Sequence, residues 1–285
     1  MLKGGLVGIQ QALPSLKPSE KKVADYILGN PEKVVNYSVQ KLAAHAEVSE
    51  ATIVRFSRTL KCKGFQELKL RIAYDLNNNG DSDDSYQEIS IDGSVSSLIH
   101  SVSHNNMQSI KDTLSVLSEV ETEKAIDSMR KARKIAVYGI GASAVIAEDF
   151  KQKLTRIDRW CEAAYGFDEQ ATISANLCEN DAVLGISNSG QTEDIIQSLK
   201  LAKENGAAVI SLTKFGDNPV SQLADITLYA SSLEKSIRSG AMSSRISMLN
   251  VVDILYIGIA SGNHDQSIEK LENTRKAVKP SKREG

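Results

Sequence analysis

Apolar residues in the first 77 positions recur at intervals of three and four, which is the spacing of amphipathic helices. The first such pattern predicts a helix over residues 20–28, with Ser19 as its N-cap. A Gly-Asn-Pro sequence at residues 29–31 follows, and these residue types end helices. We therefore expect this part of the chain to be helical.

Two further short helices are predicted over residues 39–46 and 50–61, with Ser38 and Ser49 as their N-caps. A tight polar turn joins them, which is the plan of a helix-turn-helix unit. Three apolar residues are placed to form a small core shared by these helices, namely Leu42, Val48 and Ile53.

Residues 77–93 are polar, acidic and rich in turn formers, which is typical of a boundary between domains. After them, apolar residues at helical spacing predict one long helix or two over residues 94–117. We expect this segment to pack on the second domain or on a partner chain.

The remainder alternates short apolar runs with helical patterns. Uniformly apolar strands separated by helices predict a parallel sheet covered on both faces. The fold class is thus a two-domain one, with an all-α helix-turn-helix domain before a three-layer α/β domain. Strands are expected at residues 135–138, 159–164, 182–186, 208–212 and 226–229, and helices at 142–157, 193–205 and 239–259.

Composition supports a folded, cytoplasmic protein with no membrane segment, since 41% of residues are hydrophobic and 25% charged. The three cysteines, Cys62, Cys161 and Cys178, are scattered, so we expect neither a disulfide framework nor a metal site. Charge is uneven along the chain. Residues 1–77 hold 12 basic and 7 acidic side chains, a net +5, whereas the rest of the chain is net −7. A basic front end on an acidic body favours a nucleic-acid partner.

The third predicted helix separates into two faces when its residues are placed about 100° apart. Ile53, Phe56, Ser57 and Leu60 share one side and are expected in the core. The opposite side suits a DNA major groove, because arginine binds guanine edges or phosphates and small methyl-bearing side chains meet the thymine methyl. A solvated basic face on a small helical bundle is the alternative. The candidate DNA-binding residues are Ser49, Ala51, Thr52, Val54, Arg55, Arg58, Lys61 and Lys63.

A hydroxyl-rich turn follows the predicted strand at residues 182–186. Ser187, Ser189 and Thr192 can point hydroxyls into this turn, and Gly190 lets the backbone come close to a ligand. The first N–H groups of the next helix face the same spot, so the turn suits a phosphate. Each hydroxyl could instead serve as a helix cap.

A second glycine turn follows the strand at residues 135–138 and contains Gly139, Gly141 and Ser143. It lies at the carboxyl end of its strand, where ligands of such sheets bind. A dinucleotide site is the competing interpretation, but the third glycine is missing and Glu162 is the one acidic candidate for the next strand. We therefore expect Ser143 to join the phosphate site and expect no cofactor.

These motifs carry a family resemblance. Gly-Ile-Gly-Ala-Ser at residues 139–143, with Ile-Ser-Asn-Ser-Gly-Gln-Thr-Glu at 186–193, resembles the sugar isomerase (SIS) domain, a phosphosugar-binding α/β fold. The front end, with Leu42, Arg55, Phe56 and the Lys-Gly-Phe at residues 63–65, resembles the helix-turn-helix of the RpiR family of bacterial transcription regulators, including regulators of the MurR type.

The resemblance implies a transcriptional repressor of sugar or amino-sugar catabolism genes. It implies domains at residues 1–77 (DNA-binding, with the motif at about 38–58), 78–120 (linker and connecting helix), 121–264 (SIS) and 265–285 (tail). Its partners would be a palindromic double-stranded operator, a phosphosugar such as N-acetylmuramic acid 6-phosphate or another hexose phosphate, and further copies of the chain in a homodimer or homotetramer. The implied effector-binding residues are Gly141, Ser143, Ser187, Asn188, Ser189, Gly190, Gln191 and Thr192.

SIS domains also occur in enzymes, so a phosphosugar isomerase or lyase is the alternative function. An isomerase needs a general base placed against the proton that it moves. None of the four histidines, His45, His100, His104 and His264, lies in the phosphate motifs, and Glu193 is better explained as a favourable charge at a helix N-terminus. We therefore expect no catalytic residue.

Overall fold

The computed structural model describes residues 4–78, 94–231 and 241–278 of the chain. Its internal contacts divide the chain into two compact units. One unit contains Met1–Ser118, Lys214–Asp217 and Tyr229–Ser247, and the other contains Glu119–Thr213, Asn218–Leu228 and Met248–Gly285. Each unit is assembled from separate stretches of the chain, so these units do not test the continuous domain bounds expected from the sequence. Those bounds stay predictions. Most of the predicted linker at residues 77–93 lies outside the described residues.

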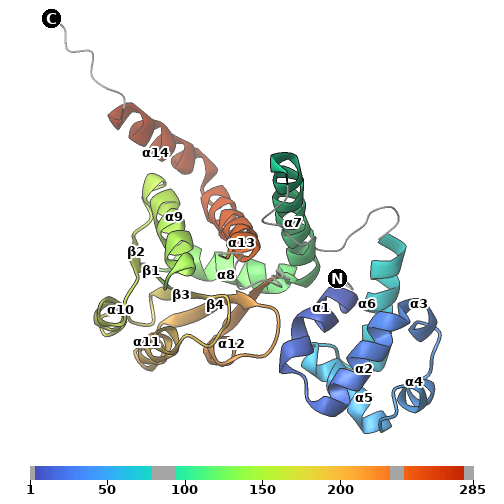
Figure 1. Ribbon diagram of the computed structural model, residues 1–285. Coiled ribbons are helices and arrows are strands. Elements are labelled where there is room, and N and C mark those ends of the chain that lie inside the picture. The colour runs from blue at the N-terminus through green and yellow to red at the C-terminus, as the bar shows by residue number, and fades with distance from the viewer. Residues whose placement is uncertain (1–3, 79–93, 232–240, 279–285) are drawn as a thin grey trace, which may run out of the picture. The chain divides into compact units, whose positions relative to one another are not determined.

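The first unit is built mainly from helices, which Figure 1 colours from blue at the start of the chain to dark green for the last of them. They are α1 (Gly5–Ala12), the 3-10 turn η1 (Leu13–Ser15), α2 (Pro18–Gly29), α3 (Pro31–Val34), α4 (Val39–His45), α5 (Glu50–Thr59), α6 (Phe65–Asn78) and α7 (Val95–Val116).

Two of the predicted N-caps are confirmed. The Ser38 hydroxyl accepts the Lys41 N–H at 3.1 Å, and the Ser49 hydroxyl accepts the Thr52 N–H at 3.3 Å. Each bond satisfies one of the helix's free N–H groups and fixes where α4 and α5 begin.

The prediction that Ser19 caps the first long helix is wrong. Helix α2 begins at Pro18, two residues before the predicted start at residue 20, and its N-cap is Lys17 with extended backbone angles. Proline is preorganised for the first helical position, where its missing N–H costs nothing. The carboxylate of Glu20 accepts the Lys17 N–H at 3.3 Å, so the bond found at this helix start comes from Glu20 and not from Ser19.

The predicted core of the helix-turn-helix unit is confirmed. Leu42 and Ile53 are fully buried, and Val48 packs against the same cluster. Helix α5 also buries Phe56 on that side. Helix α6, which the sequence pattern did not predict, completes this core with Leu68 and Ile72 among its buried residues.

Helix α7 forms as one continuous helix and inverts the usual arrangement of polar and apolar faces. Its buried residues are all polar, namely Ser101, Asn105, Gln108, Ser109, Asp112 and Thr113. Four apolar side chains are between 54% and 72% exposed, namely Val95, Ile99, Met107 and Leu114. At about 100° per residue these four lie within one third of the helix circumference. The helix therefore presents an apolar stripe to its surroundings.

The second unit contains a five-stranded sheet with the strand order β2-β1-β3-β4-β5. Strands β2, β1, β3 and β4 pair in parallel. The parallel sheet predicted from the apolar runs is thus confirmed. The strands are β1 (Ile135–Gly139), β2 (Cys161–Ala164), β3 (Ala182–Ser187), β4 (Ala208–Lys214) and β5 (Ile226–Ala230).

Helices cover both faces of this sheet, which makes three layers (Figure 1). Helix α9 packs on one face, whereas α10 and α11 pack together on the other. The inward sides of the strands are therefore apolar on both faces, as their sequences require. The helices after α7 are α8 (Glu119–Lys131), α9 (Ala142–Arg156), α10 (Phe167–Ser174), α11 (Glu193–Glu204), α12 (Pro219–Leu223), α13 (Met242–Ser261) and α14 (His264–Ala277).

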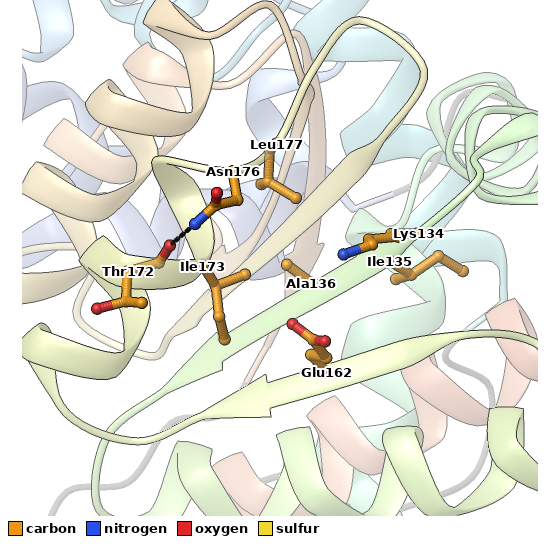
Figure 2. Close-up of a pocket in the computed structure, with 8 residues that line it drawn as sticks. All are labelled: Lys134, Ile135, Ala136, Glu162, Thr172, Ile173, Asn176 and Leu177. Atoms are coloured by element: carbon orange, nitrogen blue, oxygen red, sulfur yellow. Dashed lines mark hydrogen bonds between the residues drawn. The ribbon is translucent and has the colours of Figure 1, made fainter.

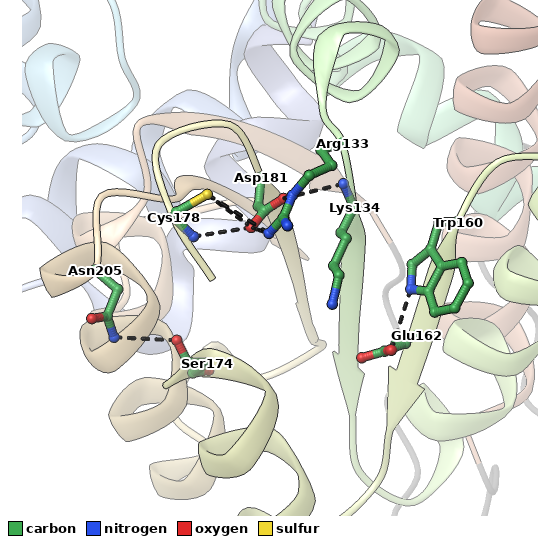
Figure 3. Close-up of polar contacts among 8 residues, drawn as sticks. All are labelled: Arg133, Lys134, Trp160, Glu162, Ser174, Cys178, Asp181 and Asn205. Carbon is green, nitrogen blue, oxygen red and sulfur yellow. Dashed lines mark hydrogen bonds and ion pairs between the residues drawn. The ribbon is translucent and has the colours of Figure 1, made fainter. Parts of the chain in front are cut away.

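A buried carboxylate joins the amino ends of β1 and β3. The side chain of Asp181 has no exposed surface and accepts hydrogen bonds from Arg133 at 3.0 and 2.8 Å and from the Lys134 N–H at 3.2 Å (Figure 3). Cys178 also donates its N–H to this carboxylate at 3.0 Å. Burial alone would raise the pKa of Asp181, but the bonds from Arg133 and Cys178 hold the pKa below its usual value.

The last two helices extend beyond the sequence predictions. All of helix α14 except its first residue, His264, falls in the segment expected as a tail, and residues 279–285 lie outside the described part of the chain. Helix α13 is long and apolar enough to cross a membrane by length and composition, although only one described helix passes this test. Such a single helix is weak evidence, because the core helix of a water-soluble domain passes the same test.

Candidate DNA-binding surface and effector site

Helix α5 divides into a buried and an exposed face, as its sequence predicts. Ile53, Phe56, Ser57 and Leu60 are all buried. The exposed residues include the candidates Ala51, Val54, Arg55 and Arg58 on the helix, together with Ser49 at its N-cap and Lys61 and Lys63 just beyond it. The structure thus brings these candidates together along the exposed face of α5 and at its two ends. Four of them, Arg55, Arg58, Lys61 and Lys63, carry the positive charge that a phosphate backbone attracts.

Thr52 is placed differently from the other candidates. It is only 6% exposed, and its hydroxyl lies 3.0 Å from that of Ser49. The two hydroxyls therefore satisfy each other at the start of α5, and Thr52 contributes to the cap. Its assignment to the DNA-binding set stays a prediction, with its exposed neighbours Ala51 and Arg55 better placed for direct contact.

The hydroxyl-rich turn after β3 is closed by its own side chains. The Ser187 hydroxyl accepts the Gly190 N–H at 3.1 Å and lies 2.9 Å from the hydroxyl of Thr192. The Ser189 hydroxyl accepts the Gln191 N–H at 3.2 Å. Ser187 is only 3% exposed, whereas Ser189 and Gln191 are exposed and Thr192 is half-buried. Hydroxyls and N–H groups of the kind that bind a phosphate are therefore concentrated in six consecutive residues.

The conformation of this turn requires glycine at position 190. The φ of Gly190 is +66°, a left-handed conformation that side-chain-bearing residues adopt at a cost. A Cβ atom at this position would lie 2.1 Å from Oδ1 of Asn218 and 2.2 Å from its Cγ. Close packing against Asn218 therefore fixes the backbone of the turn.

Asn218 is a residue of this site that the sequence pattern did not reveal. It is buried at the N-cap of α12, where its Oδ1 accepts the Ser221 N–H at 2.9 Å. Its Nδ2 donates to the Thr213 hydroxyl at 3.0 Å, and Val220 donates its N–H to the carbonyl of Gly190 at 3.1 Å. The Asn-Pro sequence at 218–219 signals a helix start, but only the fold shows that it supports the turn after β3.

Sheet register places the two expected ligand-binding turns next to each other. Gly139 at the end of β1 pairs with Ile186, the residue before Ser187. The carboxyl ends of β1 and β3 therefore lie side by side, and the turn containing Gly141 and the 9% exposed Ser143 follows directly. Asn188, the remaining candidate in the turn after β3, is half-buried. This edge of a doubly covered parallel sheet is where such folds bind ligands.

A cavity of about 290 Å³ lies at the other end of the strands (Figure 2). Lys134, Ile135 and Ala136 line it from the start of β1, and Glu162 lines it from β2. This position is opposite to the glycine and serine turns, so the cavity is not the expected phosphate site.

The same geometry removes the support for a dinucleotide site. Glu162 pairs with Ala136 near the amino end of the strands and accepts a hydrogen bond from the indole N–H of Trp160 at 3.2 Å (Figure 3). The acidic residue of a dinucleotide fold lies instead at the carboxyl end of its strand, beside the glycine turn. Glu162 therefore cannot take that role.

The four histidines lie in helices other than α9 and α11, which follow the two turns. His45 lies in α4, where its ring stacks against Tyr26 and Tyr37 at centroid distances of 5.5 and 5.1 Å. His100 and His104 lie in α7, and His264 begins α14. Glu193, in the first turn of α11, accepts a hydrogen bond from Gln197 one turn along the same helix. Within the described residues, no three His, Cys, Asp or Glu side chains are grouped to hold a metal ion.

Comparison with known proteins agrees with this two-part arrangement. Residues 3–79 match the model of the helix-turn-helix domain of the rpiR family, and residues 128–258 match that of the SIS domain. An HTH-type transcriptional regulator of Caldanaerobacter subterraneus is 41% identical over 279 residues, covering 96% of each chain. The HTH-type transcriptional regulator YbbH of Bacillus subtilis is 37% identical, covering 98% of each chain. The solved structure of Vibrio vulnificus NanR, described as complexed with ManNAc-6P, shares the fold with a TM-score of 0.61 at 24% identity, covering 97% of this chain and 98% of that one.

A helix-turn-helix unit and a SIS domain in one chain define a transcriptional regulator that carries its own ligand-binding domain. The chain belongs to the RpiR family of these regulators.

Proposed function

We propose that this regulator is a cytoplasmic repressor of genes for sugar or amino-sugar catabolism, and that a phosphosugar bound to its SIS domain controls its binding to DNA. One observation carries this proposal. The chain combines an exposed basic face on α5 with a turn rich in hydroxyl and N–H groups at the carboxyl end of β3. The first suits DNA, and the second suits a small phosphate.

The ligand is proposed to be a hexose phosphate. Its phosphate would lie against Ser187, Ser189 and Thr192, with Ser143 contributing from the neighbouring strand end. N-acetylmuramic acid 6-phosphate is the first candidate and other hexose phosphates follow it. The NanR structure, which is described as containing an amino-sugar phosphate, supports this choice of class.

Control of DNA binding requires two states of the protein with different affinities for the ligand. We propose that the ligand-bound state holds the two recognition helices of a dimer at a spacing that no longer matches a palindromic operator. Half-sites one turn of DNA apart need both α5 helices placed at that separation. Ligand binding and operator binding then oppose each other by the same coupling free energy.

A second copy of this chain is the proposed partner of helix α7. The apolar stripe formed by Val95, Ile99, Met107 and Leu114 is exposed, whereas the polar side of the helix is buried. Covering the stripe with the same stripe of a second copy would form a two-fold interface, which is the symmetry that a palindromic operator requires. Ile99→Asp with Met107→Asp should lower the mass measured by light scattering to that of one chain, and an unchanged mass would contradict this interface.

Two measurements on the full chain test the proposed function. Selection from a duplex library with a randomised centre should enrich one sequence with two-fold symmetry, and hexose phosphates should then lower the affinity of the protein for it. A thermal-shift screen of phosphosugars should find one that stabilises the protein, by about 2.7 kcal/mol at a concentration 100 times its Kd. Failure to enrich any duplex would contradict the regulator.

Mutation of the turn separates ligand binding from DNA binding. Ser187→Ala with Ser189→Ala should abolish the thermal shift and the ligand's effect on DNA affinity, while DNA affinity without ligand is kept. Thr155→Ala is the matched control. It also removes a hydroxyl, but an exposed one at the C-terminal end of α9, whereas Ser143 lies at the N-terminal end of that helix. A full response in the serine double variant would place the ligand elsewhere, and steady turnover of the phosphosugar by wild-type protein would favour an isomerase or lyase.

A further inference from the structure

One buried carboxylate lies directly beneath the exposed face of α5. Glu20 is in the first turn of α2, and α2 packs against α5 (Figure 1). The Glu20 side chain is 5% exposed, whereas that of Arg55 is 54% exposed. The carboxylate is therefore held in the protein, while the guanidinium above it is open to solvent.

Three groups contact this carboxylate, one by an ion pair and two by hydrogen bonds. Oε1 of Glu20 lies 3.4 Å from Nε of Arg55 and 3.4 Å from the hydroxyl of Thr59. Oε2 accepts the N–H of Lys17 at 3.3 Å, at the start of the same helix. A buried carboxylate needs such partners to offset the loss of hydration. Because its second oxygen is bound to its own helix, Glu20 offers Arg55 an acceptor whose position is fixed.

The ion pair with Glu20 uses only the Nε atom of the Arg55 guanidinium. Nε forms the ion pair, and among the residues that the structure describes neither terminal nitrogen of Arg55 has an ion-pair partner. The two terminal nitrogens are the edge that binds O6 and N7 of guanine, or two oxygens of a phosphate. The pairing with Glu20 thus leaves the DNA-reading edge available.

We infer that Glu20 is a positioning residue that holds Arg55 in the conformation in which its terminal nitrogens read DNA. The inference rests on the proposed function, because it assigns Glu20 a role in DNA recognition. The physical gain is preorganisation. A free arginine side chain loses much rotamer freedom when it binds, and a guanidinium that is already held by Nε loses less.

The test is a double-mutant cycle on DNA binding by the full chain. The probe is the duplex most strongly enriched by wild-type protein from the randomised library, and the reference is a duplex of the same composition in shuffled order. Glu20→Gln should lower affinity for the enriched duplex on the order of tenfold, the loss expected when one good contact to a base is disturbed. Affinity for the shuffled duplex should stay nearly constant. In an Arg55→Ala background, Glu20→Gln should change neither affinity, because no side chain is left to position.

Asp75→Asn controls for the loss of a buried carboxylate elsewhere in the same unit. Asp75 is also buried and accepts the N–H groups of Gly4 and Leu6 at 3.0 and 2.9 Å, where α1 begins. This variant should lower thermal stability and leave the ratio of the two DNA affinities unchanged.

Three results would overturn the positioning role. Equal losses from Glu20→Gln with and without Arg55 would mean that Glu20 only supports the fold. Unchanged affinity in Glu20→Gln would mean that Arg55 does not need it, and increased affinity would mean that Glu20 competes with DNA for Arg55. Each leaves the regulator intact, whereas failure of wild-type protein to enrich any duplex would overturn the regulator and this inference together.

Discussion

Replacing Gly190 by alanine is the most direct test of the turn after β3. Two costs can be worked out from the structure. The left-handed backbone at φ +66° costs a residue with a Cβ about 1 kcal/mol. The new methyl group would also lie 2.1 Å from Oδ1 of Asn218, so the asparagine must move.

Moving Asn218 breaks its hydrogen bonds to the Thr213 hydroxyl and from the Ser221 N–H. Each such bond contributes about 1 kcal/mol, because a protein bond replaces one to water. The total expected loss for Gly190→Ala is therefore about 3 kcal/mol of unfolding free energy. The ligand response should be lost as well, since the turn cannot keep its shape.

Gly206→Ala is the matched control. Its φ is +88°, but its Cβ would meet Glu179 at no less than 3.5 Å, which is ordinary van der Waals contact. This variant should lose only the backbone cost of about 1 kcal/mol. Urea unfolding followed by the fluorescence of Trp160, the one tryptophan in the sequence, reports on the sheet that contains both sites.

A second variant separates the two costs. Asn218→Gly removes the side chain that collides, and glycine is tolerated at a helix N-cap. In that background Gly190→Ala should cost only about 1 kcal/mol more. If Gly190→Ala destabilises wild-type protein no more than Gly206→Ala does, or if Asn218→Gly leaves its cost unchanged, the packing argument for this turn is wrong.

Two further predictions concern titratable groups, Asp181 and Cys161 beside or in the sheet and Cys62 in the helical core of the first unit. Because bonding to Arg133 and Cys178 lowers the folded-state pKa of Asp181, its stabilisation should be complete above the unfolded value near 3.8 and be lost as pH falls through the lower folded value. At neutral pH, Asp181→Asn should therefore lower the unfolding free energy by about 2 kcal/mol relative to wild type. This difference should begin to shrink only when the pH falls below the unfolded pKa near 3.8. A difference that begins to shrink near pH 6 would contradict this. Burial raises the pKa of Cys62 to about 11 and that of Cys161 to about 12, so iodoacetamide at mildly alkaline pH should alkylate both far more slowly in folded than in urea-unfolded protein.

The sequence by itself determined those features that depend on residues close together in the chain. Hydrophobic spacing located α5, α7 and the strands of the sheet to within a few residues, and Ser38 and Ser49 marked two helix starts correctly. It also separated the buried from the exposed side of α5. Periodicity and capping act within one or two helical turns, so a sequence displays them directly.

Local reasoning failed where a neighbour competed for the same role. Ser19 has the residue type of an N-cap, but Pro18 starts the helix earlier and Glu20 supplies the bond to Lys17. The helical part of the segment after residue 264 went unpredicted, as did helices α1, α6, α8, α10 and α12. Thr52 lies at the edge of the exposed face by angle, yet its hydroxyl meets that of Ser49 and it is buried.

Only the tertiary structure decided which distant residues complete each site. Asn218 packs on Gly190 because β3 and β4 are neighbours in the sheet, and Glu20 meets Arg55 because α2 packs on α5. The polar burial of α7 is likewise invisible in its apolar pattern, which left open whether the apolar side packs on the second domain or on a partner chain. Hydrogen bonds and close packing reach only a few ångströms, so their partners are set by where the fold brings side chains together and not by their spacing in the sequence.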